Sequence, residues 1–201
     1  MIHRYRFTTR LVSLLILIFI SVTSTADTRP TSNPVAQSPH QKIADALLKD
    51  ILTTTWIAEG KGPHVIYIFF DPNCPACNQL NHTFRPWVEQ GQIELRWIPV
   101  GTLMTTSLGK AAALLEAKNP LAALTENETK FSRETGFGGI AEEPLPRDAT
   151  LKRLDNNLDV LKHTVNMAVP TMVFRNKENQ ATFIQGAPPA GPLGQIVREV
   201  K

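Results

Sequence analysis

The 201-residue sequence has only two cysteines and no cluster of residues typical of a structural metal site. The cysteines, Cys74 and Cys77, form a single Cys-x-x-Cys pair, and no second pair exists in the chain. None of the five histidines belongs to a His-x3-His pair. Zinc usually needs four ligands at such close spacings. The sequence therefore predicts no metal site, and zinc binding stays an alternative for the two cysteines.

The sequence also lacks an excess of charge and a phosphate-binding loop. The first 26 residues contain three arginines and no acidic residue, so 18 basic and 18 acidic residues remain in the rest of the chain. The net charge of +3 of the whole sequence therefore comes from this first segment. The sequence has no basic patch with interleaved aromatic residues, no Gly-rich phosphate-binding loop and no internal repeat. These absences argue against nucleic acid as a partner.

Residues 1–26 have the features of a secretory signal peptide. A basic start is followed by an apolar run at 11–22, interrupted only by serines, and by small residues at 24–26 where a signal peptidase would cleave. The apolar run is shorter than the ~20 residues that a membrane-spanning helix needs, although an uncleaved membrane anchor stays an alternative. Residues 27–40, rich in proline and small polar residues, are expected to be a flexible leader.

The two cysteines stand between a predicted strand and a predicted helix. The apolar run at 65–70 is typical of a central strand that is buried on both faces, and residues 78–90 have a helical pattern. The redox motif between them is Cys74-Pro75-Ala76-Cys77. A strand, a Cys-x-x-Cys pair and a helix in this order are typical of a dithiol redox site.

The spacing of the cysteines places Cys74 at the first turn of this helix. Unpaired backbone N–H groups and the helix dipole at that turn stabilise a thiolate, which is the form that attacks a disulfide. Pro75 suits the first turn, because its missing N–H costs nothing there. Cys77 lies one turn further along and should be less exposed. We therefore expect Cys74 to be the nucleophile and Cys77 the resolving thiol.

A structural disulfide is a further alternative for the two cysteines. It would close so short a loop that its entropic gain is small. A secreted chain with many cysteines would be a disulfide scaffold. This chain, with a signal peptide and a single pair, instead has the composition of a protein that acts on the disulfides of other exported proteins.

The remaining pattern predicts an α/β domain at 56–201, preceded by an amphipathic linker helix at 41–55. We expect this helix to pack on the domain rather than form a partner interface, because apolar stripes are mostly core. Pro86 should kink or split the helix after the motif. The other predicted elements are a connection at 56–64, a second strand at 93–100, a helical insertion at about 102–167, a hairpin at 172–184 and a last helix at 191–200.

This order of elements resembles the thioredoxin fold, with a helical insertion between the second strand and the loop that carries the fold's cis-proline. Val169-Pro170-Thr171 stands at the position of that loop, just before the hairpin. The resemblance implies a cis bond before Pro170 and a loop that faces the two cysteines. It also implies that the backbone of Val169, Pro170 and Thr171 binds a substrate strand. A trans-proline at the start of a strand is the alternative.

Short motifs narrow the resemblance to the bacterial periplasmic thiol:disulfide interchange proteins, in the DsbC/DsbG group and nearest its DsbG branch. They are Phe70-Asp71-Pro72, Arg85-Pro86-Trp87-Val88, Ile98-Pro99-Val100-Gly101 and Asn176-Lys177-Glu178-Asn179. The resemblance covers about residues 56–200. It implies a periplasmic isomerase or reductase that exchanges disulfides with exported proteins carrying disulfides or oxidised cysteines. It implies no cofactor beyond the dithiol, and a membrane partner that is either a DsbD-like reductant or a DsbB-like oxidase.

Two departures from that group affect the prediction. Only about 38 residues separate the expected cleavage site from the first strand, too few for the group's N-terminal dimerisation domain, so we expect a monomer. Val169 replaces the threonine that the group has before its cis-proline and is similar to the DsbA branch. A monomeric DsbA-like disulfide donor is therefore an alternative function, and a non-catalytic periplasmic chaperone or metal-binding module is another. Phe70, Trp87 and Met172 are weaker candidates for substrate contacts, each more typical of core.

Overall fold

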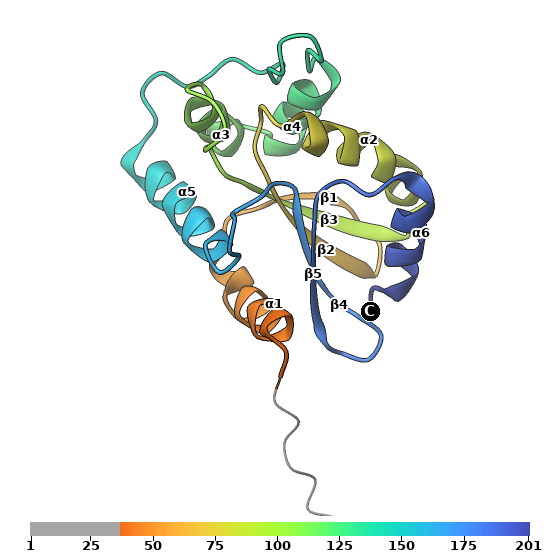
Figure 1. The fold of residues 1–201 in the computed structure, drawn as a ribbon. Coiled ribbons are helices and arrows are strands. Elements are labelled where there is room, and N and C mark those ends of the chain that lie inside the picture. Colours follow the sequence, from red (N-terminus) through yellow and green to blue (C-terminus); the bar gives the residue numbers. More distant parts are fainter. Residues whose placement is uncertain (1–36) are drawn as a thin grey trace, which may run out of the picture. The chain divides into compact units, whose positions relative to one another are not determined.

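The computed structural model describes residues 37–201, and every helix and strand discussed below lies in this range (Figure 1). The predicted signal peptide at 1–26 and the first ten residues of the predicted leader lie outside the described residues. Within 37–201, no helix combines the length and the apolar character that crossing a membrane requires.

A five-stranded mixed sheet forms the centre of the described chain, with the strand order β1-β3-β2-β4-β5. β2 and β3 are parallel, and the other neighbouring strands are antiparallel. The strands are β1 (Ile57–Gly60), β2 (His64–Phe70), β3 (Ile93–Pro99), β4 (Thr171–Arg175) and β5 (Ala181–Gln185). β2 therefore has the central position that its apolar sequence predicts.

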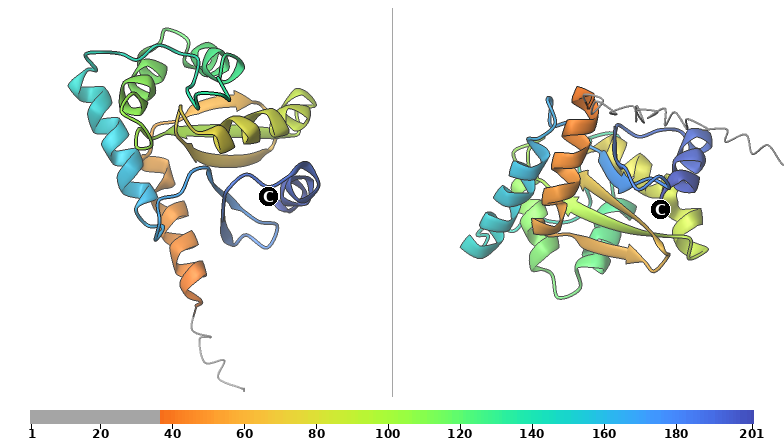
Figure 2. Two further views of the ribbon diagram at one scale, coloured as in Figure 1. Left: turned by 45° about the horizontal axis from the view of Figure 1, so that its top comes forward. Right: turned by 90° about the horizontal axis from the view of Figure 1, so that it is seen from below.

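The helices of residues 37–201 pack on both faces of this sheet (Figure 2). They are α1 (Pro39–Asp50), α2 (Pro75–Glu89), α3 (Ser107–Glu116), α4 (Pro120–Thr129), α5 (Asp148–Leu161) and α6 (Ala190–Glu199). On one face, Ile68 of β2 shares a core with Leu80 of α2 and Leu193 of α6. On the other face, Phe69 packs in a second core with Leu47 of α1 and with α5. Neighbouring residues of β2 thus point to opposite faces, as the alternation of a strand requires.

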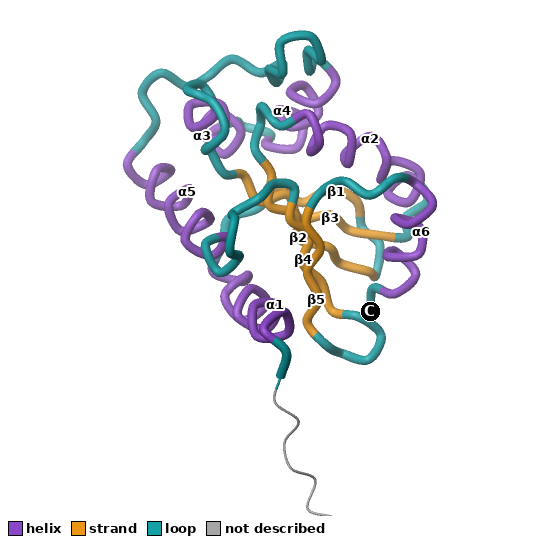
Figure 3. The backbone as a smooth tube through the Cα atoms, in the orientation of Figure 1, coloured by secondary structure: helices purple, strands orange, loops and turns teal. Residues whose placement is uncertain are grey.

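The predicted helical insertion is present between β3 and β4. It consists of α3, α4 and α5, within the predicted range of about 102–167. A long loop at 130–147 joins α4 to α5 (Figure 3). The side chain of Asn157 in α5 anchors the insertion to the sheet, because its amide donates hydrogen bonds to the carbonyls of Thr55 (3.0 Å) and Pro99 (2.9 Å).

The predicted linker helix has slightly different bounds in the structure. α1 spans Pro39–Asp50 and continues into a short 3-10 turn at Ile51–Thr53. Ser38 caps it, since its hydroxyl accepts the backbone N–H of Gln41 (3.1 Å). The last two residues of the predicted leader are therefore helical. The apolar stripe of α1 packs on the sheet, where Leu47 is fully buried.

The prediction of an irregular connection at 56–64 is wrong, because residues 57–60 form the edge strand β1, which is antiparallel to β3. The sequence does not predict this strand, because an acidic residue, Glu59, stands at one of its buried positions. Burial of its carboxylate is tolerated because the group accepts hydrogen bonds from Arg85 (3.0 Å) and from the indole N–H of Trp97 (2.8 Å). Neither partner is near Glu59 in sequence, so hydrophobic alternation alone does not predict this strand.

The structure also shows no split of the helix at Pro86. α2 runs unbroken from Pro75 to Glu89 with the proline inside it. An internal proline removes one backbone hydrogen bond and crowds the preceding turn. Tertiary packing offsets this cost, because Phe84 and Trp87, on either side of the proline, stack edge to face and contact the main core.

Candidate active site

Cys74 caps the N-terminus of α2. Its sulfur accepts a hydrogen bond from the backbone N–H of Cys77, with Sγ and N 3.1 Å apart. Pro75 occupies the first helical position and Ala76 the second. The sulfur of Cys74 therefore lies where the N–H groups of the first turn have no partner within the helix. This is the position that the Cys-x-x-Cys spacing predicts.

The two cysteines are free thiols, and their pKa values are shifted in opposite directions. Only 3% of Cys74 and 1% of Cys77 is exposed. The pKa of Cys74 is lowered, chiefly because the Cys77 thiol and backbone N–H groups of the turn donate hydrogen bonds to its sulfur, while burial opposes this. The pKa of Cys77 is raised well above its ordinary value, first by burial and then by its hydrogen bond to Cys74. Cys74 is thus the more acidic thiol of the pair, and Cys77 is the one that gives up its proton less readily.

The loop around Pro170 lies directly against Cys74. The Val169–Pro170 peptide bond is cis, as predicted. The carbonyl oxygen of Val169 lies 3.7 Å from the sulfur of Cys74. Thr171 begins β4, and its hydroxyl donates a hydrogen bond to the carbonyl of Ala168 (2.6 Å). The structure therefore brings the predicted substrate-binding residues together with the predicted nucleophile.

A buried carboxylate that the sequence analysis did not select holds the loop before the motif. Oδ1 of Asp71 accepts hydrogen bonds from the N–H of Asn73 (2.9 Å) and the hydroxyl of Ser107 (2.7 Å). Oδ2 accepts from the N–H groups of Thr102 (2.8 Å) and Leu103 (3.0 Å). Donors from the motif loop, the β3–α3 loop and α3 thus meet at one carboxylate. This arrangement satisfies the buried charge and fixes the start of α2.

Two buried asparagines tie the same loop to the helical insertion. Asn73 donates a hydrogen bond to the hydroxyl of Ser107 (3.1 Å) and accepts one from the N–H of Gly138 (3.0 Å). Asn127 of α4 donates to the carbonyl of Pro72 (3.0 Å). The insertion therefore supports the segment that carries Cys74, in addition to covering the end of the sheet.

Glu128 of α4 is a buried carboxyl group whose charge contributes to the raised pKa of Cys77. Its oxygens accept hydrogen bonds from the side-chain amides of Asn78 (2.9 Å) and Asn127 (3.0 Å). Burial raises the pKa of Glu128, and its charge contributes to the raised pKa of Cys77. Glu128 lies far from the motif in sequence, and the helix around it has no clear apolar stripe. No sequence signal pointed to it.

The three weaker candidates for substrate contacts are core residues. Phe70 and Met172 are fully buried, and Trp87, a half-buried residue of α2, stacks edge to face on Phe84 and packs against the same core. Their side chains fill the space between the sheet and the helices, as their apolar neighbours in the sequence indicate.

Three loops that contact the site each expose an apolar side chain instead. Leu103 belongs to the loop that binds Asp71, Phe137 precedes the glycine that binds Asn73, and Met167 lies two residues before Val169. The exposed fractions of Leu103, Phe137 and Met167 are 51%, 40% and 44%. We call these three side chains the apolar rim. No sequence pattern selects them, because each stands in a loop that only the fold places next to a residue of the site.

Other features of the described chain lie away from the dithiol. A cavity of about 460 Å³ between α1 and β4 is lined by residues such as Leu48 and Phe174, and by none from the motif or the Pro170 loop. Within residues 37–201, no three His, Cys, Asp or Glu side chains come close enough together to hold a metal ion. The chemistry identified in this part of the chain is therefore centred on Cys74 and Cys77.

Two curated proteins are similar to most of this chain. It is 32% identical over 166 residues to the thiol:disulfide interchange protein DsbG of Pseudomonas aeruginosa, covering 82% of this chain and 63% of the relative. It is 29% identical over 147 residues to the protein of the same name from Escherichia coli, covering 71% of this chain and 56% of the relative. The chain thus spans about six tenths of the length of these relatives. No family model matches the sequence.

Solved structures share the fold. A periplasmic thioredoxin-like protein from Salmonella enterica serovar Typhimurium matches with a TM-score of 0.57 and 19% identity, covering 79% of this chain and 95% of that one. ScsC of Proteus mirabilis in a compact conformation matches with a TM-score of 0.57 and 20% identity, covering 81% and 79%. The α-DsbA2 protein of Wolbachia pipientis matches with a TM-score of 0.55 and 13% identity, covering 82% and 99%. The predicted fold class, a thioredoxin fold with a helical insertion, is confirmed.

Proposed function

We propose, from the premise that this chain is a DsbG-like thiol:disulfide protein, that it is a periplasmic oxidoreductase that exchanges disulfides with exported proteins. The observation that carries the proposal is the opposite shift of the Cys74 and Cys77 pKa values at the start of α2. Because a thiolate attacks disulfides and a thiol does not, we assign Cys74 as the nucleophile and Cys77 as the thiol that reacts in the second step.

The proposed reaction starts from the reduced dithiol. The Cys74 thiolate attacks one sulfur of a substrate disulfide, a mixed disulfide forms, and the other substrate sulfur leaves as a thiolate that takes up a proton. Cys77 then loses its proton and attacks the sulfur of Cys74. The substrate leaves with both thiols reduced, having received two electrons, and the Cys74–Cys77 disulfide remains. When a substrate thiolate attacks the mixed disulfide first, the substrate disulfide is rearranged and Cys74 is released unchanged.

The surroundings of Cys77 support this order of events. The negative charge and the hydrogen bond of Cys74 are among the causes of the raised Cys77 pKa. Both disappear once Cys74 is covalently bound to a substrate. The pKa of Cys77 therefore falls when the mixed disulfide forms, and its thiolate becomes available at the step that needs it.

The surface around the dithiol supports a polypeptide as substrate. The backbone of Val169 lies beside Cys74, in position to bind an extended strand. The next two residues hold the loop in place, because the carbonyl of Pro170 accepts the N–H of Gly186 (2.8 Å) and Thr171 is paired on both sides within the sheet. The apolar rim offers contacts to the side chains on either side of a substrate cysteine. A small thiol would use neither feature, so we favour exported proteins with disulfides or oxidised cysteines.

The proposed partners follow from the direction of electron flow. A reductase or isomerase needs its dithiol restored by a DsbD-like membrane reductant, whereas a disulfide donor needs a DsbB-like oxidase. We propose the first, in keeping with the DsbG relatives, together with a cleaved signal peptide and a monomeric state. The dithiol itself carries the two electrons, so the proposed reaction uses no bound cofactor.

Insulin reduction tests the proposal directly. Wild-type protein should reduce insulin disulfides, and Cys74→Ser should lower the rate to the uncatalysed level. Cys77→Ser should stop turnover at the mixed disulfide, which a non-reducing gel separates from the free protein. If Cys74→Ser keeps the wild-type rate, the oxidoreductase proposal is wrong, and a non-catalytic chaperone or metal-binding module explains the fold better.

One observation favours a second candidate function, a DsbA-like disulfide donor. The recorded contact of the Pro170 loop with the Cys74 sulfur is through the carbonyl of Val169, and a valine side chain donates no hydrogen bond to it. The reduction potential of the pair, measured in glutathione buffers, separates the roles. A value near −120 mV fits a reactive disulfide, whereas one near −270 mV fits a reductant and excludes the donor.

A further inference from the structure

A small cavity adjoins the redox motif on the exposed side of α2. Its volume is about 210 Å³, and Pro75, Gln79 and Arg133 line it. Pro75 follows Cys74 directly, and Gln79 lies one helical turn further along, so the two form one wall. Arg133 comes from the loop after α4 and forms the opposite wall. No residue of the Pro170 loop lines this cavity.

A short, well-anchored turn presents Arg133. The N–H of Ser132 donates to the carbonyl of Phe137 (2.9 Å), and the N–H of Gly136 donates to the carbonyl of Ser132 (2.8 Å). The base of the turn is fixed to the motif loop through Gly138, whose N–H donates to Asn73. These hydrogen bonds therefore fix the backbone of Arg133 relative to the motif loop, and its side chain is exposed.

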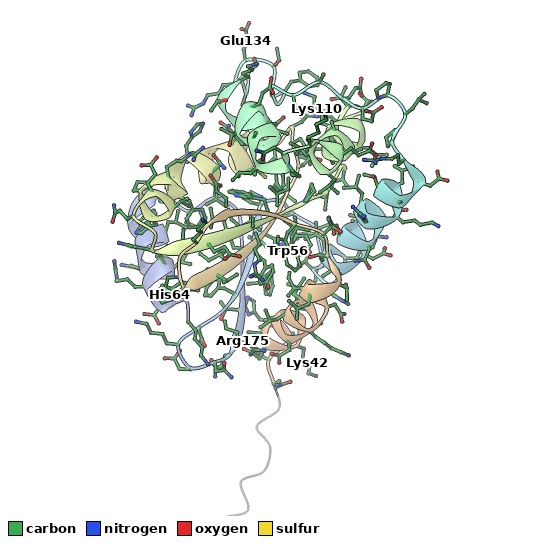
Figure 4. The ribbon with its side chains drawn as sticks, turned by 180° about the vertical axis from the view of Figure 1, so that it is seen from behind. Lys42, Trp56, His64, Lys110, Glu134 and Arg175 are labelled. Atoms are coloured by element: carbon green, nitrogen blue, oxygen red, sulfur yellow. The ribbon has the colours of Figure 1, made fainter. Side chains whose placement is uncertain are left out.

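The charge of Arg133 is unpaired among the described residues. Within 37–201, its guanidinium makes no ion pair or side-chain hydrogen bond, and no acidic residue lines the cavity. The adjacent acid, Glu134, lies at the outer tip of the turn and points away from the body of the domain (Figure 4). The nearby cation Lys130 pairs with Glu126 (2.7 Å).

We propose that Arg133 is a specificity-determining residue, which binds a carboxylate side chain of the substrate close to the cysteine that Cys74 attacks. This rests on the proposed function, because it assumes that a polypeptide disulfide reaches Cys74. A strand held by the Pro170 loop brings its cysteine to Cys74 and extends beyond that loop to Pro75 and the cavity. An arginine in a cavity without acids selects an aspartate or glutamate there, since its planar guanidinium matches a carboxylate with two parallel hydrogen bonds.

The test compares model peptide disulfides in matched pairs. Each pair places one Asp or one Asn at the same position flanking the cysteine, and the whole flank is scanned. The measured quantity is the ratio of kcat/KM for the Asp peptide to that for the Asn peptide, with the full chain as catalyst and reduced glutathione in excess to restore its dithiol after each turnover. Wild type should give a ratio of about two to five at one or two positions, the usual effect of a partly exposed ion pair, and added salt should lower it.

Two variants separate a contact from a general effect of charge. Arg133→Gln should bring the ratio to about one, and Arg133→Lys should keep part of it. Lys130→Gln removes the same charge three residues away, outside the cavity, and should keep the wild-type ratio. Equal rates for Asp and Asn peptides in the wild type, or an equal loss of the ratio in Lys130→Gln, would overturn the role of Arg133. If no peptide disulfide is reduced at all, the proposed function itself is wrong.

Discussion

The two sides of the dithiol are built differently. On the side of the helical insertion, Asp71 and Asn73 bind partners in four segments, which are the motif loop, the β3–α3 loop, α3 and the α4–α5 loop. Every one of these contacts is a hydrogen bond of 3.1 Å or less. On the side of the Pro170 loop, the recorded contact to Cys74 is one carbonyl at 3.7 Å. The residues before that loop include Val165 and Met167, both exposed.

This difference teaches how such a site divides its tasks. The nucleophile needs one fixed position, because the acidity of Cys74 depends on the N–H groups of a single helical turn. The opposite loop is where we propose that a substrate binds, and such a role needs accessible surface. Polar networks hold the first side, whereas the exposed side chains of Val165 and Met167 keep the approach to the second side accessible. Each of the following variants breaks or sharpens this contrast.

The largest effect is expected for Asp71→Ala on the insertion side. The change leaves four donors without their acceptor, at least two of them buried, and each such loss costs about 1–3 kcal/mol before relaxation. We expect a loss of about 3 kcal/mol or more in the free energy of unfolding, measured by urea denaturation. Asp159→Ala removes an exposed carboxylate paired with Lys162 and should cost less than about 1 kcal/mol. Similar losses in both variants would contradict the anchoring role of Asp71.

A matched pair of glycines compares the two sides directly. A methyl group on Gly138 would overlap the side-chain oxygen of Asn127 and the carbonyl of Pro72, so Gly138→Ala should cost about 2–3 kcal/mol through forced displacement of packed atoms. Gly186, beside the Pro170 loop, has space around it but a φ of +90°, and Gly186→Ala should cost about 1 kcal/mol from backbone strain. Urea denaturation of both variants measures the two losses in the free energy of unfolding. A larger loss for Gly186→Ala than for Gly138→Ala would contradict the tighter packing of the insertion side.

The charge of Glu128 should be visible in the titration of Cys77. In a Cys74→Ala background, Cys77 is the only thiol, and its thiolate can be followed by ultraviolet absorbance against pH. The ionised carboxylate repels a thiolate and raises the pKa of Cys77, so adding Glu128→Gln should move the titration to lower pH. Glu134→Gln, at the exposed tip of its turn, should leave it unchanged. A shift to higher pH in the Glu128 variant would show that its charge does not act on Cys77.

The fold could be predicted where residues carry their own local signal. The apolar run of β2, the helical stripes of the insertion and the proline before the hairpin all depend on neighbours in sequence, and the structure confirms them. β1 was missed because Glu59 becomes a buried strand residue only when Arg85 and Trp97 bind it. The sequence predicts a kink or a split of α2 at Pro86, because the local cost of the proline is visible there, whereas the packing that keeps the helix unbroken is not.

The same distinction applies to the site. The cysteines and the Val169–Pro170–Thr171 loop follow from short motifs, so the sequence predicts them. Asp71 stands in one of those motifs, yet its role depends on donors about thirty residues away in sequence. Glu128 is further still, and nothing in a polar helix marks it as buried. The burial of a polar residue depends on its hydrogen-bond partners, and a single sequence does not show which distant residues these are.

The smallest effect on stability is expected at Met167, where it shows what the Pro170 side is built for. Met167 has a φ of +48°, a left-handed conformation that costs a residue with a Cβ about 1 kcal/mol. Met167→Gly removes this strain but adds freedom to the unfolded chain, so stability should rise by less than about 1 kcal/mol. Reduction of a polypeptide disulfide should nevertheless slow by about threefold to fivefold, because a half-buried methionine contact is worth on the order of 1 kcal/mol.

Asn179→Gly is the control for Met167→Gly, because Asn179 has a similar φ of +65° in the β4–β5 turn, away from the dithiol. It should leave peptide reduction unchanged. If Met167→Gly gains stability and keeps full activity, the exposed methionine contributes nothing to substrate binding and the apolar rim is smaller than proposed. If it gains stability and loses activity, strain is retained on the Pro170 side because the side chain it positions binds substrate. The insertion side, where the buried side chains of Asp71 and Asn73 are paired for stability, should offer no such exchange.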